Sequence, residues 1–402
     1  MSAGSRILLF ALVCLGLGVL PAAQETEAQR YPEQGQAVVR PEPAPRTDDA
    51  DSATEGMQTP VLGFVSSAGT GELRSLVGIP GASALGEPLA VPAGVLGVYF
   101  APGQSYSLLA PKTGNSLGLM TFQGADEQAV VSVCGAIPQP DIVTFSPGAS
   151  TAALYSKTEG RLQVIRGLPD SPQLARVVAA SDLPDEVRFL AIADDGVTLV
   201  AGTVQSAVYL LPQVGSPRLL FTAEDLQGVA FAPRSSDLVA FDRARSTAFL
   251  LQNVDGASSY LLLADGLTGL DGNVFLETSR AGAVIASTNS NTLWKINLQP
   301  LEVESIHLPG MPQMLQPLRI SGDYLLFYRI GFPAWILDSD GAEGSISFVP
   351  AGAAPRRRPK LISLPTIRGL KGDQNEQPDL LSQPGFGAGC TDVAEPIPAP
   401  KP

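Results

Sequence analysis

Short runs of alternating apolar and polar residues fill the middle of the chain, from residue 61 to residue 350. Leu162 and Val164 occupy alternate positions of one run, and Leu238-Val239-Ala240-Phe241 forms another. The segments between runs are rich in turn residues, as in Thr158-Glu159-Gly160, Asp194-Asp195-Gly196 and Asn289-Ser290-Asn291. A period of two that is interrupted by such residues predicts β-hairpins. No window in this region keeps a period of 3.6 with helix caps, so helices should be short or absent.

One phrase recurs in this region: an apolar strand that ends in an aromatic residue, a turn, and a second strand of small apolar residues. Its clear copies are Val98-Tyr99-Phe100-Ala101-Pro102, Val143-Thr144-Phe145-Ser146-Pro147 and Val229-Ala230-Phe231-Ala232-Pro233. Weaker copies carry Ile192, Leu276 and Leu318 at the aromatic position, and the intervals from Phe100 onward are 45, 47, 39, 45 and 42 residues. A unit of this length with three or four strands predicts one blade of a β-propeller.

The number of blades follows from six copies of the phrase and one partial unit before them. The partial unit has expected strands at Val61–Val65, Leu73–Val77 and Leu89–Val91, without the opening phrase. The sequence therefore predicts an all-β fold: a single β-propeller over residues 61–350, with seven four-stranded blades. Six or eight blades remain alternatives. The first blade should lack its innermost strand, which we expect a segment near the other end of the chain, such as Lys360–Leu364, to supply.

The Phe-Ser-Pro and Phe-Ala-Pro phrases, each followed by a small-apolar strand, resemble the blade repeats of bacterial secreted propellers of the TolB-like and YVTN-like groups. The resemblance covers about 290 residues. WD40-like repeats would also carry a Gly-His and a Trp-Asp pair in each blade. That subfamily is disfavoured, because the chain has one His, and Trp294 and Trp335 precede Lys295 and Ile336. These groups include scaffolds, sensors and enzymes, so the resemblance implies a fold and not one function.

Residues 1–23 have the order of a secretory signal peptide. Arg6 precedes an apolar run from Ile7 to Leu20, and a Pro-Ala-Ala triplet follows that ends at Ala23. We expect cleavage after Ala22 or Ala23. An uncleaved anchor is the alternative, but the run has about 14 residues where roughly 20 are needed to span a bilayer. The sequence thus predicts a secreted or periplasmic protein with no stable transmembrane segment after signal removal.

Both flanks of the predicted propeller have compositions that bury little apolar area. Residues 24–60 contain eight acidic residues, three basic residues and five prolines. The C-terminal flank opens with Pro355-Arg356-Arg357-Arg358-Pro359-Lys360 and ends in a Pro-rich run. Such segments cannot offset an ordering entropy of about 1 to 2 kcal/mol per residue. We expect a disordered acidic linker at 24–60 and a disordered Pro-rich tail at 365–402, with the arginine triplet solvated.

Charge and cysteine content limit the partners. The chain has 26 basic and 39 acidic residues and a formal net charge of −13, so nucleic acid is excluded as a partner. Val13 precedes Cys14 where a lipoprotein signal requires a small residue, and signal removal would delete Cys14. Cys134 and Cys390 then reach an oxidising compartment, where they can form a disulfide. The favoured interpretation is that Cys134, at the end of an apolar run, packs as a small hydrophobic residue.

Residues suited to catalysis are few. The single His, His307, lies in Ile306-His307-Leu308-Pro309, so a catalytic triad or a cluster of imidazoles is not expected. Asp338–Gly344 has the oxygen ligands of a calcium loop, but a hairpin turn explains the same residues. Gly69-Thr70-Gly71 and Gly114-Asn115 lack the helix and the Lys of a phosphate site. We assign no catalytic, cofactor-binding or metal-ligating residue, and expect no cofactor.

Two classes of function remain. The first is a noncatalytic secreted propeller, a monomeric binding or scaffold module that offers its rim or its central channel to a protein or glycan partner. The alternative is a hydrolase or lyase whose channel site uses Asp, Glu and Arg without His. The side chains that line the central channel distinguish the two, because a catalytic site needs clustered carboxylates with raised pKa values in a concave pocket.

Overall fold

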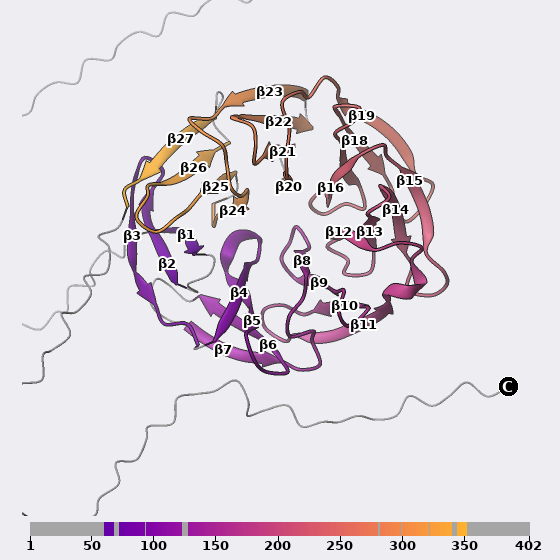
Figure 1. Ribbon diagram of the computed structural model, residues 1–402, viewed down its shortest axis with the longest axis horizontal. Helices are drawn as coiled ribbons and strands as arrows, with labels where there is room; N and C mark the ends of the chain where they lie inside the picture. Colours follow the sequence, from indigo (N-terminus) through magenta and orange to yellow (C-terminus); the bar gives the residue numbers. More distant parts are fainter. Residues whose placement is uncertain are drawn as a thin grey trace, which may run out of the picture. The chain divides into compact units, whose positions relative to one another are not determined.

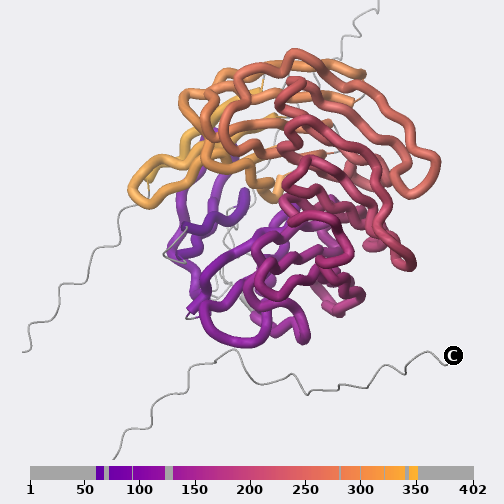
Figure 2. Tube along the Cα trace, turned by 45° about the vertical axis from the view of Figure 1, so that its right-hand side comes forward, coloured from indigo at the N-terminus to yellow at the C-terminus, as the bar shows by residue number. Residues whose placement is uncertain are grey.

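The computed structural model describes residues 60–351, with the exception of 68–71, 93, 123–127, 280–281, 299, 321 and 340–343. These residues form seven antiparallel sheets that stand around one axis as the blades of a ring (Figure 1). In each blade the strands pair in chain order, so the chain runs outward from the axis and ends on the rim. The first and last blades lie side by side in Figure 2, where β3 contacts β27.

The strands of the first four blades have the following bounds. Blade 1 contains β1 (Val61–Ser66), β2 (Leu73–Ile79) and β3 (Ala82–Leu89). Blade 2 contains β4 (Val95–Phe100), β5 (Tyr106–Pro111), β6 (Leu117–Phe122) and β7 (Gln128–Val133). Blade 3 contains β8 (Ile142–Phe145), β9 (Thr151–Ser156), β10 (Arg161–Arg166) and β11 (Gln173–Ala179). Blade 4 contains β12 (Val187–Ile192), β13 (Leu199–Thr203), β14 (Ala207–Leu211) and β15 (Arg218–Thr222).

Three further blades complete the ring. Blade 5 contains β16 (Leu226–Phe231), β17 (Leu238–Asp242), β18 (Thr247–Gln252) and β19 (Ser259–Ala264). Blade 6 contains β20 (Val274–Thr278), β21 (Gly282–Ser287), β22 (Thr292–Leu298) and β23 (Leu301–His307). Blade 7 contains β24 (Gln316–Pro317), β25 (Asp323–Phe327), β26 (Ala334–Asp338) and β27 (Ser345–Val349). The helical elements of the described residues are two 3-10 turns, η1 (Pro102–Gln104) and η2 (Ala180–Asp182).

The predicted seven-bladed propeller is confirmed, and the six- and eight-bladed alternatives are wrong. The recurring phrase marks the end of the innermost strand: Phe100, Phe145 and Phe231 are the last residues of β4, β8 and β16. One expected strand was misplaced. Leu89–Val91 was predicted as the third strand of blade 1, but Gly81, at a φ of 80°, turns the chain at once and β3 begins at Ala82.

The core lies between neighbouring blades. Every residue of β9 and β21, the second strands of blades 3 and 6, is buried, whereas most residues of the rim strand β11 are exposed. Between blades 4 and 5, for example, Val200 of β13 and Phe231 of β16 belong to one buried cluster. Each blade thus buries both of its faces against the next, and small residues on the second strands allow this close approach.

A tight turn follows the innermost strand in several blades. The N–H of Ala149 donates to the carbonyl of Ser146 at 2.8 Å, and the N–H of Gln104 donates to the carbonyl of Ala101 at 2.9 Å. Ala149 and Gln104 have positive φ values of 58° and 45°. The proline of the phrase is the second residue of this turn, a position that its fixed φ favours. The repeated Pro therefore has a conformational cause.

Among the described residues blade 1 has three strands, and a side chain of blade 2 bonds to the free edge of its first strand. Its first strand, β1, is buried like the second strands of other blades. Gln104 of η1 accepts from the N–H of Phe64 at 2.5 Å and donates to the carbonyl of Phe64 at 3.3 Å. The N–H of Arg319 from blade 7 donates to the carbonyl of Leu62 at 2.9 Å. These contacts satisfy backbone groups on the inner edge of β1.

Several predictions fall on residues outside the described part of the chain. They are the signal peptide at 1–23, the linker at 24–60 apart from Pro60, the closing strand at 360–364 and the tail at 365–402; these stay predictions. Among the described residues, no helix has the length and apolar character needed to cross a bilayer.

Candidate functional site

A cavity of about 320 Å³ lies at the centre of the ring. The ends of the innermost strands β8, β12, β16 and β20 line it, together with the turns that follow innermost strands. Pro102, Pro147 and Pro233 of the recurring phrase are among the residues of these turns. The recurring phrase thus builds much of the wall of the cavity, and no described residue of blade 1 lines it.

Glu277 of β20 brings a carboxyl group into the wall of this cavity. Its neighbour Leu276 packs on Gly228, and the hydroxyl of Thr278 donates to the carbonyl of Phe231 at 2.6 Å, so both face blade 5. Phe275 packs in the cluster shared with blade 7. Because side chains alternate along a strand, Glu277 faces blade 7 from the wall of the cavity.

The environment of Glu277 changes its protonation. Burial raises the pKa of this carboxyl from its ordinary 4.5 to about 8, because removal from water disfavours the charged form. No hydrogen bond or ion pair of its side chain is found among the described residues. At neutral pH Glu277 therefore carries a proton that it can donate to a ligand.

Two other charged residues line the cavity, Arg319 and Asp323. The guanidinium of Arg319 already donates to the carbonyl of Phe122 at 3.2 Å and lies 5.3 Å from the ring centre of Phe64, and burial lowers its pKa. Asp323 is buried at the start of β25. The Arg319 side chain thus connects blade 7 to Phe64 of blade 1 and Phe122 of blade 2.

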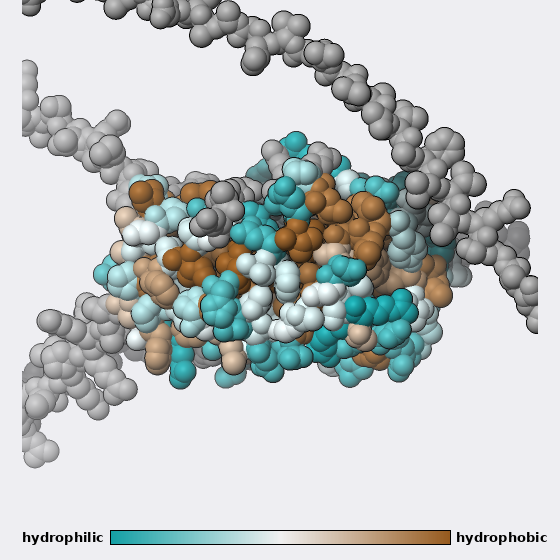
Figure 3. Space-filling view, turned by 90° about the horizontal axis from the view of Figure 1, so that it is seen from above, coloured by the Kyte–Doolittle hydropathy of each residue, from teal (hydrophilic) through white to brown (hydrophobic). Residues whose placement is uncertain are grey.

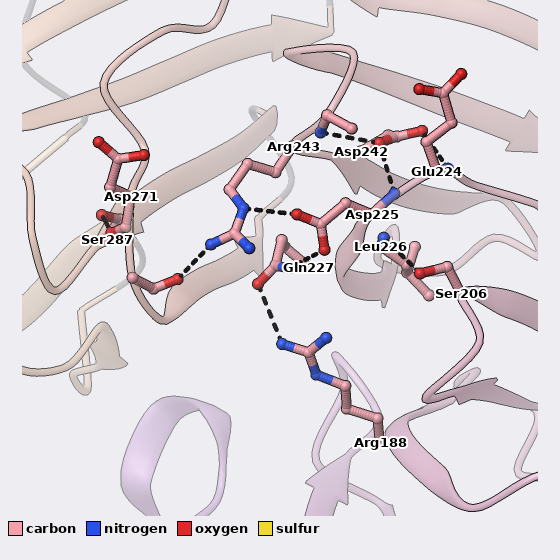
Figure 4. A network of polar contacts seen from close by, with 12 residues as sticks. Arg188, Ser206, Glu224, Asp225, Leu226, Gln227, Asp242, Arg243, Asp271 and Ser287 are labelled. Atoms are coloured by element: carbon pink, nitrogen blue, oxygen red, sulfur yellow. Dashed lines mark hydrogen bonds and ion pairs between the residues drawn. The ribbon is translucent and has the colours of Figure 1, made fainter.

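A polar network joins the opposite ends of the innermost strands (Figure 4). Arg188 donates to Gln227 at 3.3 Å, Gln227 donates to Asp225 at 2.5 Å, and Arg243 donates to Asp225 at 2.7 Å. Arg243 also donates to the carbonyl of Gly272 at 2.9 Å. These bonds link blades 4, 5 and 6, so the network orders the connections between neighbouring blades.

The residues singled out from the sequence lie away from the cavity. His307 ends the rim strand β23, is exposed, and has its Nε2 3.3 Å from the Asn291 amide nitrogen. Asp338 ends β26, and the turn to β27 is a hairpin, as predicted. Among the described residues, no group of three or more His, Cys, Asp or Glu side chains could hold a metal ion.

The favoured interpretation of Cys134 is wrong. Cys134 is exposed beyond the end of β7 and is disulfide-bonded, so it is not a buried hydrophobic residue. Its partner lies outside the described residues. The apolar run that led to the prediction ends at Val133, whose side chain is buried in place of that of Cys134.

Glu277 was missed, although the sequence carried a signal. It interrupts an apolar strand, Val274-Phe275-Leu276, directly after the aromatic position of the phrase. An acidic residue there could equally lie on a solvated face. Only the closed ring shows that this position faces the cavity.

Comparisons with known proteins agree with the fold. No protein-family model and no curated protein match the sequence. Among solved structures, the chain is similar to PorZ, a bacterial surface component of the type-IX secretion system of Porphyromonas gingivalis, with a TM-score of 0.52 and 11% identity over 74% of this chain. The match spans 38% of the PorZ chain. A putative 6-phosphogluconolactonase from Bacteroides uniformis gives a TM-score of 0.50 and 10% identity, covering 73% of this chain and 98% of that chain. Both likenesses show the propeller fold alone.

Proposed function

We propose that the protein is a noncatalytic binding or scaffold module, exported from the cell and monomeric, that takes a protein or glycan group into its central cavity. The observation that carries this proposal is Glu277, a carboxyl with a raised pKa in the wall of a central cavity. Concave sites in which a few polar groups are placed among apolar ones are typical of ligand binding. We infer that Glu277 donates a hydrogen bond to a carbonyl or hydroxyl oxygen of the ligand.

Export to the periplasm or the cell surface is part of the same proposal, supported by the predicted signal peptide. The blade phrases also support membership of the TolB-like or YVTN-like groups. The likeness to PorZ, itself a bacterial surface component, is compatible with such a location.

Screening on the whole protein tests the cavity. A displayed peptide library and a glycan panel are selected against wild type, Glu277→Ala, and the exposed rim variant Glu302→Ala as a matched control. Ligands that bind wild type and the control at least about tenfold more tightly than Glu277→Ala support the proposal. Ligands that bind all three proteins equally would place the binding site elsewhere.

A second candidate is the hydrolase or lyase, favoured by one observation. A carboxyl whose pKa is about 8 can act as a general acid at neutral pH, and Asp323 lines the same cavity. Any glycan found in the screen is incubated with the protein at pH 6 and analysed for products by mass spectrometry. Cleavage by wild type that Glu277→Gln lacks would make the protein an enzyme, and an intact glycan supports the binding module.

A further inference from the structure

The rim strand of blade 5 leaves an edge open for pairing. β19 has one neighbour in its sheet, β18, so the backbone groups of its outer edge have no strand partner among the described residues. Its residues, Ser259–Ala264, include no charge and no proline. Most other rim strands carry the residues that block edge pairing, such as Glu302 in β23, Arg176 in β11 and Pro88 in β3.

Three consecutive apolar side chains of β19 are exposed. Tyr260, Leu261 and Leu262 are 58%, 43% and 54% exposed, so both faces of the strand present apolar groups to solvent. The rim strands β7 and β27 also lack charge, but no three successive described side chains on them are exposed in this way. Figure 3 looks onto the side of the ring that carries β19 and β23, and apolar residues gather there in patches bordered by polar ones.

An aromatic cluster makes the inner boundary of this surface rigid. The ring of Tyr260 lies 6.2 Å from that of Phe221 in blade 4 and 5.7 Å from that of Phe249 in β18. Phe221 and Phe249 meet edge to face at 5.0 Å. Leu219 of blade 4 is exposed as well. The open edge therefore lies beside an apolar surface that is already ordered. Less conformational entropy is lost when a segment binds to such a surface.

Acidic residues stand at both ends of this edge. Asp255 precedes β19, Asp265 follows it, and both are exposed with no side-chain ion pair among the described residues. Two copies of β19 paired antiparallel would bring Asp255 of one copy near Asp265 of the other. Like charges disfavour that dimer. Arg218 donates to the carbonyl of Val254 at 2.7 Å and so offsets the charge at the Asp255 end only.

We propose that β19 is a docking edge for an extended segment of a partner protein, apolar at its centre and basic at its ends, which adds a fifth strand to blade 5. The partner's backbone would pair with the open edge, and its apolar side chains would cover Leu261 and Leu262. Its basic ends would meet Asp255 and Asp265. This surface lies on the rim and is separate from the cavity of the proposed function.

Fluorescence anisotropy with the full chain tests the proposal. The probe is a labelled peptide, Val-Thr-Val-Thr-Val-Thr with two lysines before and two after it, and the matched probe has glutamates in their place. We expect saturable binding of the lysine probe that weakens as salt increases, and at least about tenfold weaker binding of the glutamate probe.

Variants locate the binding on the protein. Leu262→Lys should weaken the lysine probe at least about tenfold, whereas Val214→Lys, at a 90% exposed turn position, is the control and should not. Asp265→Asn should weaken binding of the lysine probe by about two- to fivefold. Asp255→Asn should weaken it less, because Arg218 already offsets the charge of Asp255. Glu277→Ala should bind the probe like wild type, so this proposal and the cavity site can fail separately.

Five outcomes would overturn the proposal. Absence of saturable probe binding, or equal binding by Leu262→Lys, removes the docking edge. Equal binding of both probes removes the basic partner. A dimer in sedimentation that Leu262→Lys dissociates would make a second copy the occupant. Residues 360–368 of this chain, Lys-Leu-Ile-Ser-Leu-Pro-Thr-Ile-Arg, are also apolar with basic ends. If this segment occupied the edge, the double variant Leu361→Asp, Leu364→Asp would release it, and the probe would bind more tightly than to wild type.

Discussion

Glu277 and Gln104 are polar side chains near the axis of the ring: Glu277 lines the central cavity, and Gln104 bonds to the backbone of β1. Gln104 is fully buried and has all of its described amide bonds directed at the backbone of neighbouring blades. Glu277 has no such partner and takes a proton instead. A buried polar group thus has two outcomes here: it is satisfied and structural, or it is neutralised and available to a ligand.

Glu277 should make stability depend on pH. Its folded pKa of about 8 exceeds its ordinary value, so between about pH 5 and pH 8 the unfolded chain is ionised at this residue and the folded protein is not. Stability therefore falls as pH rises through that window, and the effect vanishes below the ordinary pKa. We expect Glu277→Gln to be more stable than wild type at pH 8 by at least about 1 kcal/mol.

Chemical denaturation of both proteins at pH 5 and pH 8 measures this effect. The difference between variant and wild type should grow with pH, since other titrating groups contribute equally to both proteins. Two stability curves that stay parallel across this range would show that the Glu277 carboxyl is ionised in the folded state.

Cys134 should be covalently tied within the mature protein. If the signal peptide is removed, Cys390 is the remaining cysteine of the chain, so the disulfide of Cys134 should join these two residues. Peptide mapping without reduction should recover a cross-linked pair that reduction separates. A free thiol at Cys134 in protein isolated from the oxidising compartment would contradict this pairing.

At the scale of elements, β1 shows how a blade can be closed without a full set of strands. Gly63 lies so near η1 that a Cβ atom there would be 2.5 Å from Gln104 Oε1 and 2.8 Å from Leu318 Cδ2. Glycine is therefore required at this position, because any side chain would displace the amide. The contact joins blades 1, 2 and 7 at one point.

Removing the Gln104 amide should destabilise the protein more than removing a comparable exposed amide. Gln104→Ala leaves the N–H of Phe64 buried without its acceptor, at a cost of about 2 to 4 kcal/mol for the lost donor and acceptor. Gln139 is the control: it also donates to two carbonyls, of Pro111 and Lys112 at 3.0 and 2.9 Å, but is exposed. Gln139→Ala should cost less than about 1 kcal/mol.

Urea denaturation of the two variants and wild type gives these differences. Equal losses for both variants would show that Gln104 does not replace a strand. A Gln104→Glu variant extends the test, because a carboxylate accepts from the N–H of Phe64 but cannot donate to its carbonyl.

The sequence predicted the blades well because their cause is local. Alternating apolar residues and the Pro-containing turn after Phe100, Phe145 or Phe231 are properties of one unit and repeat with it. The role of Gln104 could not be predicted, since it depends on β1, which is 40 residues away. The cavity position of Glu277 likewise depends on how seven blades close, which no single repeat encodes.

At the scale of the whole molecule, the ring joins residues from the two ends of the described chain. Leu62, Val65 and Leu76 of blade 1 share one buried cluster with Leu325 and Ile336 of blade 7. Gln316 of blade 7 also donates to the carbonyl of Phe64 at 3.1 Å. A closed ring has no terminal unit, so every blade face is covered by a neighbour and none needs a capping repeat.

Truncation after Gly310 should therefore abolish folding and should not leave a smaller folded domain. The truncated chain loses β24 to β27, exposes the apolar face of blade 1 and the face of blade 6 that carries Leu293 and Ile306, and removes the bonds that Arg319 and Gln316 make to β1. Open edges and uncovered apolar faces favour aggregation. Truncation after Pro365 keeps all seven blades and serves as the control, which should melt like the intact protein. Calorimetry measures both melts. A soluble 24–310 protein with a single cooperative melt near that of the intact chain would mean that six blades fold stably without the seventh.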